Sequence, residues 1–121
     1  MLDIHGTSIF LTRGDTAYLQ FPLYNVVYKD GKISEKTKYE IGDGDTLTLT
    51  VSKKANDISA VVFSHTTSEG DVIKIVPSDT RGLNIGQYHY DVELVRANGD
   101  VFTVVKDSAF NITSEVTMPN E

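Results

Sequence analysis

Residues Asp79–Leu94 read DTRGLNIGQYHYDVEL, and this stretch indicates a corner that leads into a strand. The turn formers come first, and Gly86 marks the point where the chain becomes extended. Beyond Gly86 the side chains alternate between an apolar face and a polar face. The apolar face holds Tyr88, Tyr90, Val92 and Leu94, and the polar face holds Gln87, His89, Asp91 and Glu93. Such a strand is typical of a sheet with one covered and one solvated face.

Tyr88 follows Gly86 by two residues, which gives it an expected structural role. In β-sandwiches of immunoglobulin type, a tyrosine near the start of a central strand bonds its hydroxyl to the backbone a few residues upstream. We therefore expect Leu83, Gly86 and Tyr88 to form a structural corner. The acids and the histidine on the opposite face are interpreted as solvated charge.

Short strands with turn signals between them are expected along the whole chain. Asn98-Gly99 predicts a two-residue type I′ hairpin turn after the central strand. No segment of ten or more residues keeps a helical period. The expected fold is all-β, an immunoglobulin-like antiparallel β-sandwich of seven or eight strands in one domain, 1–116, with a polar tail, 117–121. The strands are expected at Ser8–Arg13, Ala17–Tyr28, Thr46–Val51, Ala60–His65, Val72–Val76, Gly86–Leu94, Val101–Lys106 and Ala109–Val116.

The composition narrows the possible partners. The 121 residues carry a formal net charge of −6, which repels phosphate backbones, so no nucleic acid is expected as a partner. The chain has no cysteine, which excludes disulfides, thiolate metal sites and cysteine nucleophiles. Apolar runs fall far short of the roughly 20 residues of a membrane helix, and the N-terminus lacks the basic and apolar regions of a signal peptide. We expect neither a membrane partner nor a signal peptide.

Motifs that could carry chemistry are weak. Arg13-Gly14-Asp15 spells an integrin-binding tripeptide but is interpreted as a turn at the end of a strand. Asp43 and Asp45 lie in a Gly-Asp-Gly-Asp loop that could attract calcium, although the full ligand loop is absent, and whether they bind an ion stays open. His5, His65 and His89 have no metal-site spacing. No catalytic residue, metal site or cofactor is expected, and therefore no enzyme.

One surface qualifies as a possible interface, the outward face of the apolar segment Ala17–Tyr28. It comprises Tyr18, Gln20, Pro22 and Tyr24. Tyrosine adds contact area at low entropic cost, and proline belongs at a sheet edge because it lacks a backbone donor. In the alternative interpretation the strand bends near Pro22 and packs its far half beneath Lys29–Lys38, a run expected to be a loop or hairpin tip.

Five motifs, taken together in order, resemble the small all-β domain at the N-terminus of phage baseplate upper proteins and related prophage tail proteins of Gram-positive bacteria. In that family a strand ends in Thr-Arg-Gly-Asp, a Gly-Asp turn enters a threonine-rich strand, and Gly-x-Tyr-x-Tyr-Asp-Val leads to a hairpin. The matching stretches are Leu11–Ala17, Tyr39–Asp45, Gly86–Leu94, Asn98–Val105 and Phe110–Ile112.

The resemblance implies a virion structural module, made in the bacterial cytoplasm, that attaches receptor-binding components to the tail or baseplate. Its implied partners are other tail and baseplate proteins, within a multimer that could include further copies of the chain. The chain ends at Glu121, where such proteins usually continue into a helical or fibre region, so a free-standing homologue and an excised domain are both open. The alternative function is a carbohydrate-binding or adhesion module whose exposed tyrosines stack on sugars.

Overall fold

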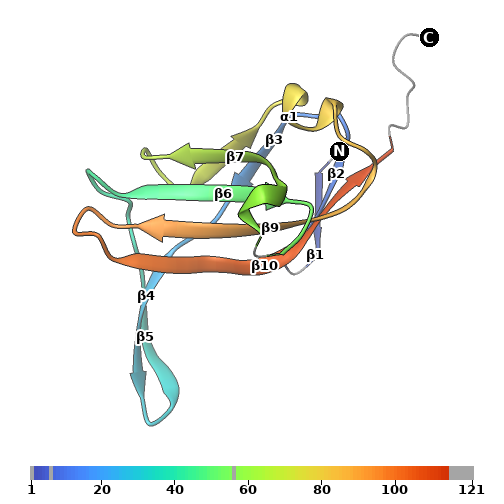
Figure 1. The fold of residues 1–121 in the computed structure, drawn as a ribbon. Helices are drawn as coiled ribbons and strands as arrows, with labels where there is room; N and C mark the ends of the chain where they lie inside the picture. Colours follow the sequence, from blue (N-terminus) through green and yellow to red (C-terminus); the bar gives the residue numbers. More distant parts are fainter. Residues whose placement is uncertain (1, 6, 56, 115–121) are drawn as a thin grey trace.

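A computed structural model describes residues 2–5, 7–55 and 57–114, so the expected tail 117–121 and the end of the last expected strand lie outside the described residues. The described chain is all-β, with two short helical turns (Figure 1). The elements are β1 (Leu2–His5), β2 (Ser8–Thr12), β3 (Ala17–Gln20), β4 (Tyr24–Lys29), β5 (Lys32–Lys38), β6 (Thr46–Ser52), η1 (Ile58–Ala60), β7 (Val61–Thr67), β8 (Val72–Ile75), α1 (Pro77–Arg81), β9 (Gly86–Val95) and β10 (Val101–Thr113).

Six strands form the main sheet in the order β1-β2-β10-β9-β6-β7. Strand β9, which ends the opening stretch of sequence, is central and pairs antiparallel with both β10 and β6. One pair of strands departs from the expected antiparallel arrangement, because β10 pairs parallel with β2, with Phe110 opposite Ile9. This contact joins residues about a hundred positions apart, which no local pattern reports.

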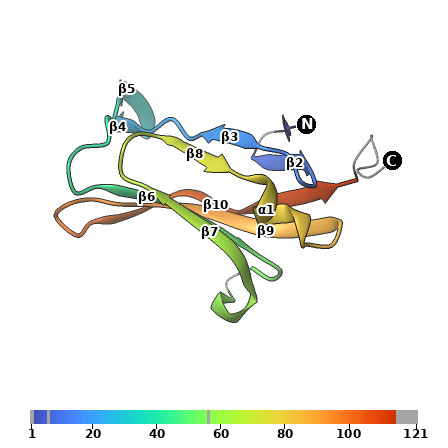
Figure 2. The same cartoon turned by 90° about the horizontal axis from the view of Figure 1, so that it is seen from above.

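The core lies between one face of this sheet and a second, two-stranded sheet made of β3 and β8 (Figure 2). The strand expected at Thr46–Val51 is present as β6, and its side chains alternate: Leu47, Leu49 and Val51 are fully buried while the threonines between them are not. The apolar face of β9 is buried in the same cluster as Ala17 and Leu19 of β3 and Ile73 and Ile75 of β8. The remaining core residues include Ile9, Leu11, Phe21, Leu23, Phe110 and Ile112.

The described residues contain ten strands, so the expected number of seven or eight was too low. The segment Ala17–Tyr28 is divided at Pro22, where the missing backbone donor ends β3. The lysine-rich run expected as a loop or hairpin tip holds the tip of a hairpin, and its greater part is strand β5. Strand β1 adds a further edge strand that pairs with β2. Conversely, the strands expected at Val101–Lys106 and Ala109–Val116 belong to one strand, β10, which has a bulge at Asp107.

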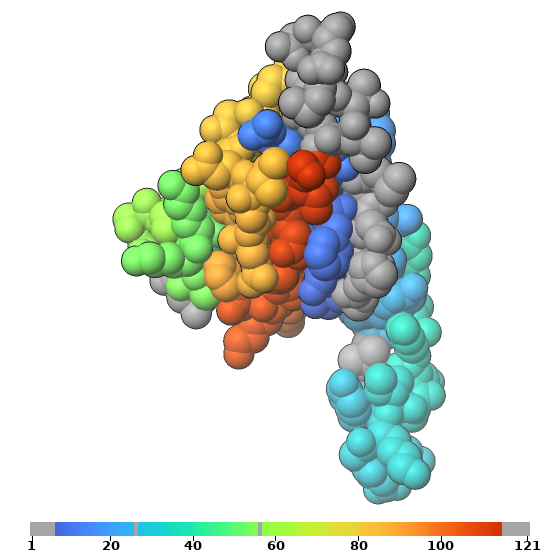
Figure 3. All heavy atoms as spheres, turned by 90° about the vertical axis from the view of Figure 1, so that its right-hand side faces the viewer, coloured from blue at the N-terminus to red at the C-terminus, as the bar shows by residue number. Residues whose placement is uncertain are grey.

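Strands β4 and β5 form a hairpin, here called the arm (Tyr24–Lys38), which projects from the body of the molecule (Figures 1 and 3). Its turn is Asp30-Gly31, with φ of 54° and 77°, as a two-residue type I′ turn requires. Six paired positions extend the arm by about 20 Å at the usual rise of a strand. None of its described side chains belongs to the buried core, and all of them are exposed.

The turn between β9 and β10 differs from the predicted type I′ turn. Arg96 N donates to Asp100 O at 2.8 Å and Gly99 N donates to Arg96 O at 2.9 Å, which leaves a three-residue loop. Gly99 takes a φ of 94°, whereas Asn98 does not enter the positive-φ region. This is the three-residue hairpin with a glycine bulge. The antiparallel pairing that the motif predicted is confirmed.

Candidate interaction surface

The predicted edge surface is exposed in the structure. Strand β3 pairs with β8 in a two-stranded sheet, and in the described part of the chain its other edge has no partner strand. Phe21 N donates to Asp71 O at 2.8 Å, so backbone pairing runs up to Pro22. The four predicted residues, Tyr18, Gln20, Pro22 and Tyr24, all face solvent, and Tyr18 is 63% exposed.

The chain does break at Pro22, as the alternative interpretation proposed, but the far half does not pack beneath a loop. Beyond Pro22, Leu23 is buried and Tyr39 N donates to its carbonyl at 2.8 Å. Strand β4 then leaves the body and pairs with β5 along the arm. The candidate surface therefore continues from the β3 edge onto a projecting hairpin.

Large apolar side chains are exposed along the arm. Tyr28 is 65% exposed, Ile33 54% and Val27 51%, and every residue of β5 is exposed. Sequence reasoning identified Tyr24 but missed Ile33, because a polar run with one apolar residue resembles a loop. The usable signal was the Asp30-Gly31 turn with apolar residues on both sides of it.

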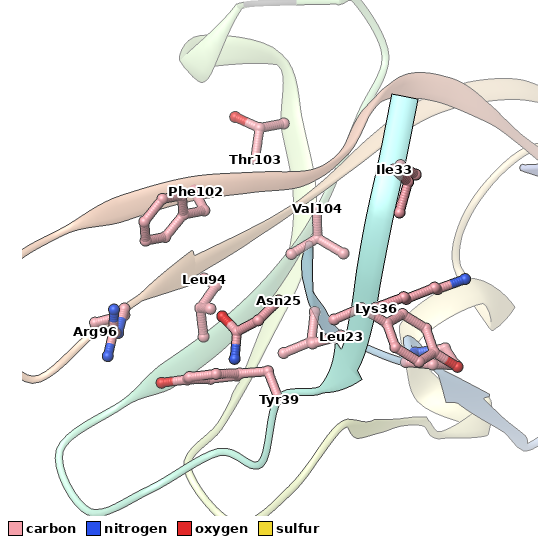
Figure 4. A pocket seen from close by; sticks show the side chains of 12 residues that line it. Leu23, Asn25, Ile33, Lys36, Tyr39, Leu94, Arg96, Phe102, Thr103 and Val104 are labelled. Atoms are coloured by element: carbon pink, nitrogen blue, oxygen red, sulfur yellow. The ribbon is translucent and has the colours of Figure 1, made fainter. Parts of the chain in front are cut away.

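A hollow of about 590 Å³ lies between the base of the arm and the β9–β10 hairpin (Figure 4). Its apolar lining comes from Leu23, Ile33, Leu94, Phe102 and Val104, and Lys36 and Arg96 contribute cations. Pro22 and Tyr24 also line it, which joins the hollow to the predicted edge surface. This volume falls within the usual range of binding pockets, and the combination of apolar walls with a few charges suits a partner's side chain.

Both cations of the hollow, and one on the β3 edge, lie against aromatic rings. Lys36 Nζ lies 4.2 Å from the centre of the Tyr24 ring, and Arg96 Cζ lies 5.4 Å from the centre of the Tyr39 ring. On the β3 edge, Lys74 Nζ lies 5.6 Å from the Tyr18 ring. These distances are within the range of cation–π attraction. The surface therefore combines apolar contact area with positive charge.

The carboxylate of Asp45 holds one wall of the hollow in place. One of its oxygens accepts from the Tyr39 hydroxyl and from Gly42 N at 3.0 Å, and the other accepts from Ala97 N at 2.9 Å. The hydrogen bond from Tyr39, followed by those from Gly42 and Ala97, lowers the pKa of Asp45. The same bond raises the pKa of Tyr39. Asp45 thus joins the loop before β6 to the β9–β10 turn.

This arrangement bears on the suggested ion site. Asp45 is buried and accepts three hydrogen bonds from protein donors, whereas Asp43 is exposed. The protein's own donors therefore occupy the carboxylate of Asp45, whereas that of Asp43 faces solvent. Among the described residues, no group of three or more side chains has the arrangement of a metal site.

The hydrogen bond expected at the corner is present. Tyr88 is buried, and its hydroxyl donates to Asn84 O at 2.9 Å, four residues upstream. Gly86 has a φ of 151°, in the region that favours glycine, and Leu83 packs against the core. The neighbouring Tyr90 donates its hydroxyl to Thr7 O, and burial raises its pKa. Both tyrosines of β9 therefore tie the sheet to chain segments outside it.

The other motifs have structural partners. His65 Nε2 lies 2.7 Å from Asp79 Oδ2, and the same oxygen accepts from Val76 N at the start of α1. His89 Nδ1 lies 3.0 Å from Asp107 Oδ1. In the Arg13-Gly14-Asp15 turn, Gly14 N donates to Thr80 Oγ1 at 2.8 Å. The structure thus separates the two described histidine side chains and packs the tripeptide against α1.

A scan against protein-family models and a search of curated proteins both gave no match to this chain. In the part of the chain that the structure describes, no helix combines the length and apolar character needed to cross a membrane.

Proposed function

We propose that this chain is a non-enzymatic structural module of a phage or prophage tail or baseplate, which attaches receptor-binding components by protein–protein contact. The observation that carries the proposal is the exposure of large apolar side chains on the arm beside the hollow at its base. Tyr28, Ile33 and Val27 are exposed on the hairpin and do not contribute to the core of their own chain. Exposed apolar side chains on an unpaired hairpin are typical of a surface that another protein covers. The phage assignment rests on the order of motifs along the sequence.

We also propose that the all-β fold is an immunoglobulin-like sandwich. Three features support this assignment. The Tyr88 hydroxyl bonds to Asn84 O, as in a tyrosine corner. The β3–β8 pair lies over one face of the main sheet with the core between them. Central strands β9 and β10 form a hairpin that supplies most of the core's aromatic residues.

The arrangement of the tyrosines favours protein contact over the alternative of sugar binding. A sugar stacks on a free ring face, but Lys36 covers the Tyr24 ring at 4.2 Å and Lys74 lies 5.6 Å from the Tyr18 ring. A protein partner can use the lysines as well as the rings, through charged hydrogen bonds to its own carboxylates. Aromatic residues and arginine are enriched in protein interfaces, whereas lysine is depleted at their centres, so we place Lys36 and Lys74 at the rim of the contact.

Co-expression with each protein encoded beside this chain's own gene tests the proposal. We expect one of those proteins to co-purify with the chain. Ile33→Asp and Phe102→Asp, which place a charge in the hollow, should each abolish co-purification. Ile58→Asp is the matched control, because Ile58 is 91% exposed on η1, away from the arm (Figure 1).

Retention of the partner by both hollow variants would contradict the proposed surface. A glycan array probed with the same preparation separates the two functions. Binding of a sugar that is lost in Tyr24→Ala, with no co-purifying protein, would replace the structural module with the carbohydrate-binding alternative.

A further inference from the structure

The arm concentrates positive charge in an acidic protein. It carries four lysines and two acidic residues, whereas the whole chain has a formal net charge of −6, so the rest of the chain carries −8. Lys29 and Lys32 stand directly opposite each other beside the Asp30-Gly31 turn. Like charges at opposite positions of a strand pair repel each other. Within the described residues neither lysine forms an ion pair, and both are exposed.

The opposite charge gathers on the solvent face of the main sheet. Asp91 and Glu93 of β9 point away from the core and are exposed, and Asp107 at the β10 bulge lies near Asp91. Burial and the charges of Glu93 and Asp107 raise the pKa of Asp91. We call Asp91 and Glu93 the carboxylate face.

Hydroxyl groups flank this carboxylate face on both sides. Thr50 stands opposite Asp91, and Thr48 stands opposite Glu93 on β6. Thr103 of β10 stands opposite Glu93 on the other side. Short polar side chains leave the carboxylates accessible from solvent to a strand laid across them. The arm tip thus holds two lysines that repel each other, and the carboxylate face holds two acids that repel each other.

We propose that the arm of one copy of this chain docks on the carboxylate face of a second copy, with Lys29 and Lys32 against Asp91 and Glu93. The two surfaces lie on different parts of the molecule, because the arm projects from the β3 layer and the carboxylate face is on the far side of the main sheet (Figures 1 and 2). The contact is therefore heterologous, and it builds a ring or an open chain of copies.

Self-docking rests on the proposed function, because it gives the arm of the interaction module one partner. The contact involves the lysines at the tip of the arm and not the hollow at its base. Docking brings each set of like charges beside charges of opposite sign. Because both surfaces are exposed, the gain per pair is modest and falls as salt is added. Self-association is thus expected at low ionic strength first.

Two double variants that remove charge test the contact by light scattering after size exclusion, over a range of protein concentrations at low salt. The arm variant carries Lys29→Gln and Lys32→Gln, and the face variant carries Asp91→Asn and Glu93→Gln. We expect the wild type to form species larger than a monomer. Each variant alone should associate roughly tenfold more weakly.

An equimolar mixture of the two variants makes the test specific. The arm variant keeps an intact face and the face variant keeps an intact arm, so one contact is possible and a complex of two copies should form and grow no further. A wild type that stays monomeric at every concentration, or a mixture that stays monomeric, would overturn the inference. If co-purification with a neighbouring protein still depends on Ile33 and Phe102 in that case, the proposed function stands and only self-docking fails.

Discussion

The main sheet and the arm use the same kinds of residues in opposite ways. On the core face of the sheet, aromatic and aliphatic side chains are buried, and polar groups such as Asp45 and Tyr90 bond to donors or acceptors far away in sequence. In the arm, tyrosine, valine and isoleucine are exposed, and its two tip lysines face each other. Side chains of the sheet thus stabilise this chain, whereas those of the arm are available to another chain.

Two alanine substitutions, one in the core and one on the arm, should differ most in their effect on stability. Phe110 is fully buried and meets Phe63 and Tyr90 edge to face, with ring centres 5.9 and 6.1 Å away. Phe110→Ala should lower the free energy of unfolding by about 3–5 kcal/mol through lost burial and a cavity. Ile33→Ala on the arm should change it by less than about 0.5 kcal/mol. Urea unfolding of both variants measures the contrast, and equal effects would refute it.

Sequence patterns predicted the sheet better than the arm. The alternation of Leu47, Leu49 and Val51 is a strong signal because one face of β6 is dry and the other is wet. Strand β5 has no dry face, since all its residues are exposed, so the same rule has nothing to detect. Pro22 correctly predicted a sheet edge at the point where β3 ends. It did not predict the direction in which the chain continues into the arm.

The ties between distant segments could not be predicted from local patterns. Asp45 looked like a turn residue or a weak ion ligand, and its role depends on Ala97 N, which is 52 residues away. Ala97 lies in the β9–β10 turn, which has three residues, whereas Asn98-Gly99 alone predicts a turn of two residues. Tyr88 was predictable because its partner, Asn84, is only four residues upstream.

Asp45→Asn should destabilise the chain more than loss of the Tyr88 hydroxyl does, because three hydrogen bonds converge on this carboxylate. An asparagine amide would turn a donor toward one of the three donors. The variant and the wild type are compared by urea unfolding at neutral pH. An unchanged midpoint would mean that Asp45 does not join the two loops.

The pH dependence of this difference follows from the pKa of Asp45, which is lowered from 3.8 in the folded chain. A lowered folded pKa means that the carboxylate stabilises the fold at pH values above 3.8. That contribution is lost as the pH falls through the lowered value. The gap between wild type and Asp45→Asn should therefore be constant near neutral pH and shrink under acid conditions.

Tyr88→Phe removes only the hydroxyl that donates to Asn84 O. We expect a loss of about 1 kcal/mol in the free energy of unfolding and no change in partner binding. Tyr28→Phe is the control, since Tyr28 is 65% exposed on the arm. If both variants lose the same amount, the corner hydrogen bond does not contribute to stability.

Shortening the arm should have the smallest effect on stability and the largest on assembly. Replacing residues 27–35 by Asn-Gly keeps Val26 opposite Lys36 and closes the strands with a compatible type I′ turn. Thermal unfolding should change little, because the deleted residues contribute nothing to the core. The shortened chain also loses Lys29, Lys32 and Ile33, so both self-association and partner co-purification should disappear. A shortened chain that fails to fold would show that the arm stabilises its own molecule, and it would remove the distinction between the two regions.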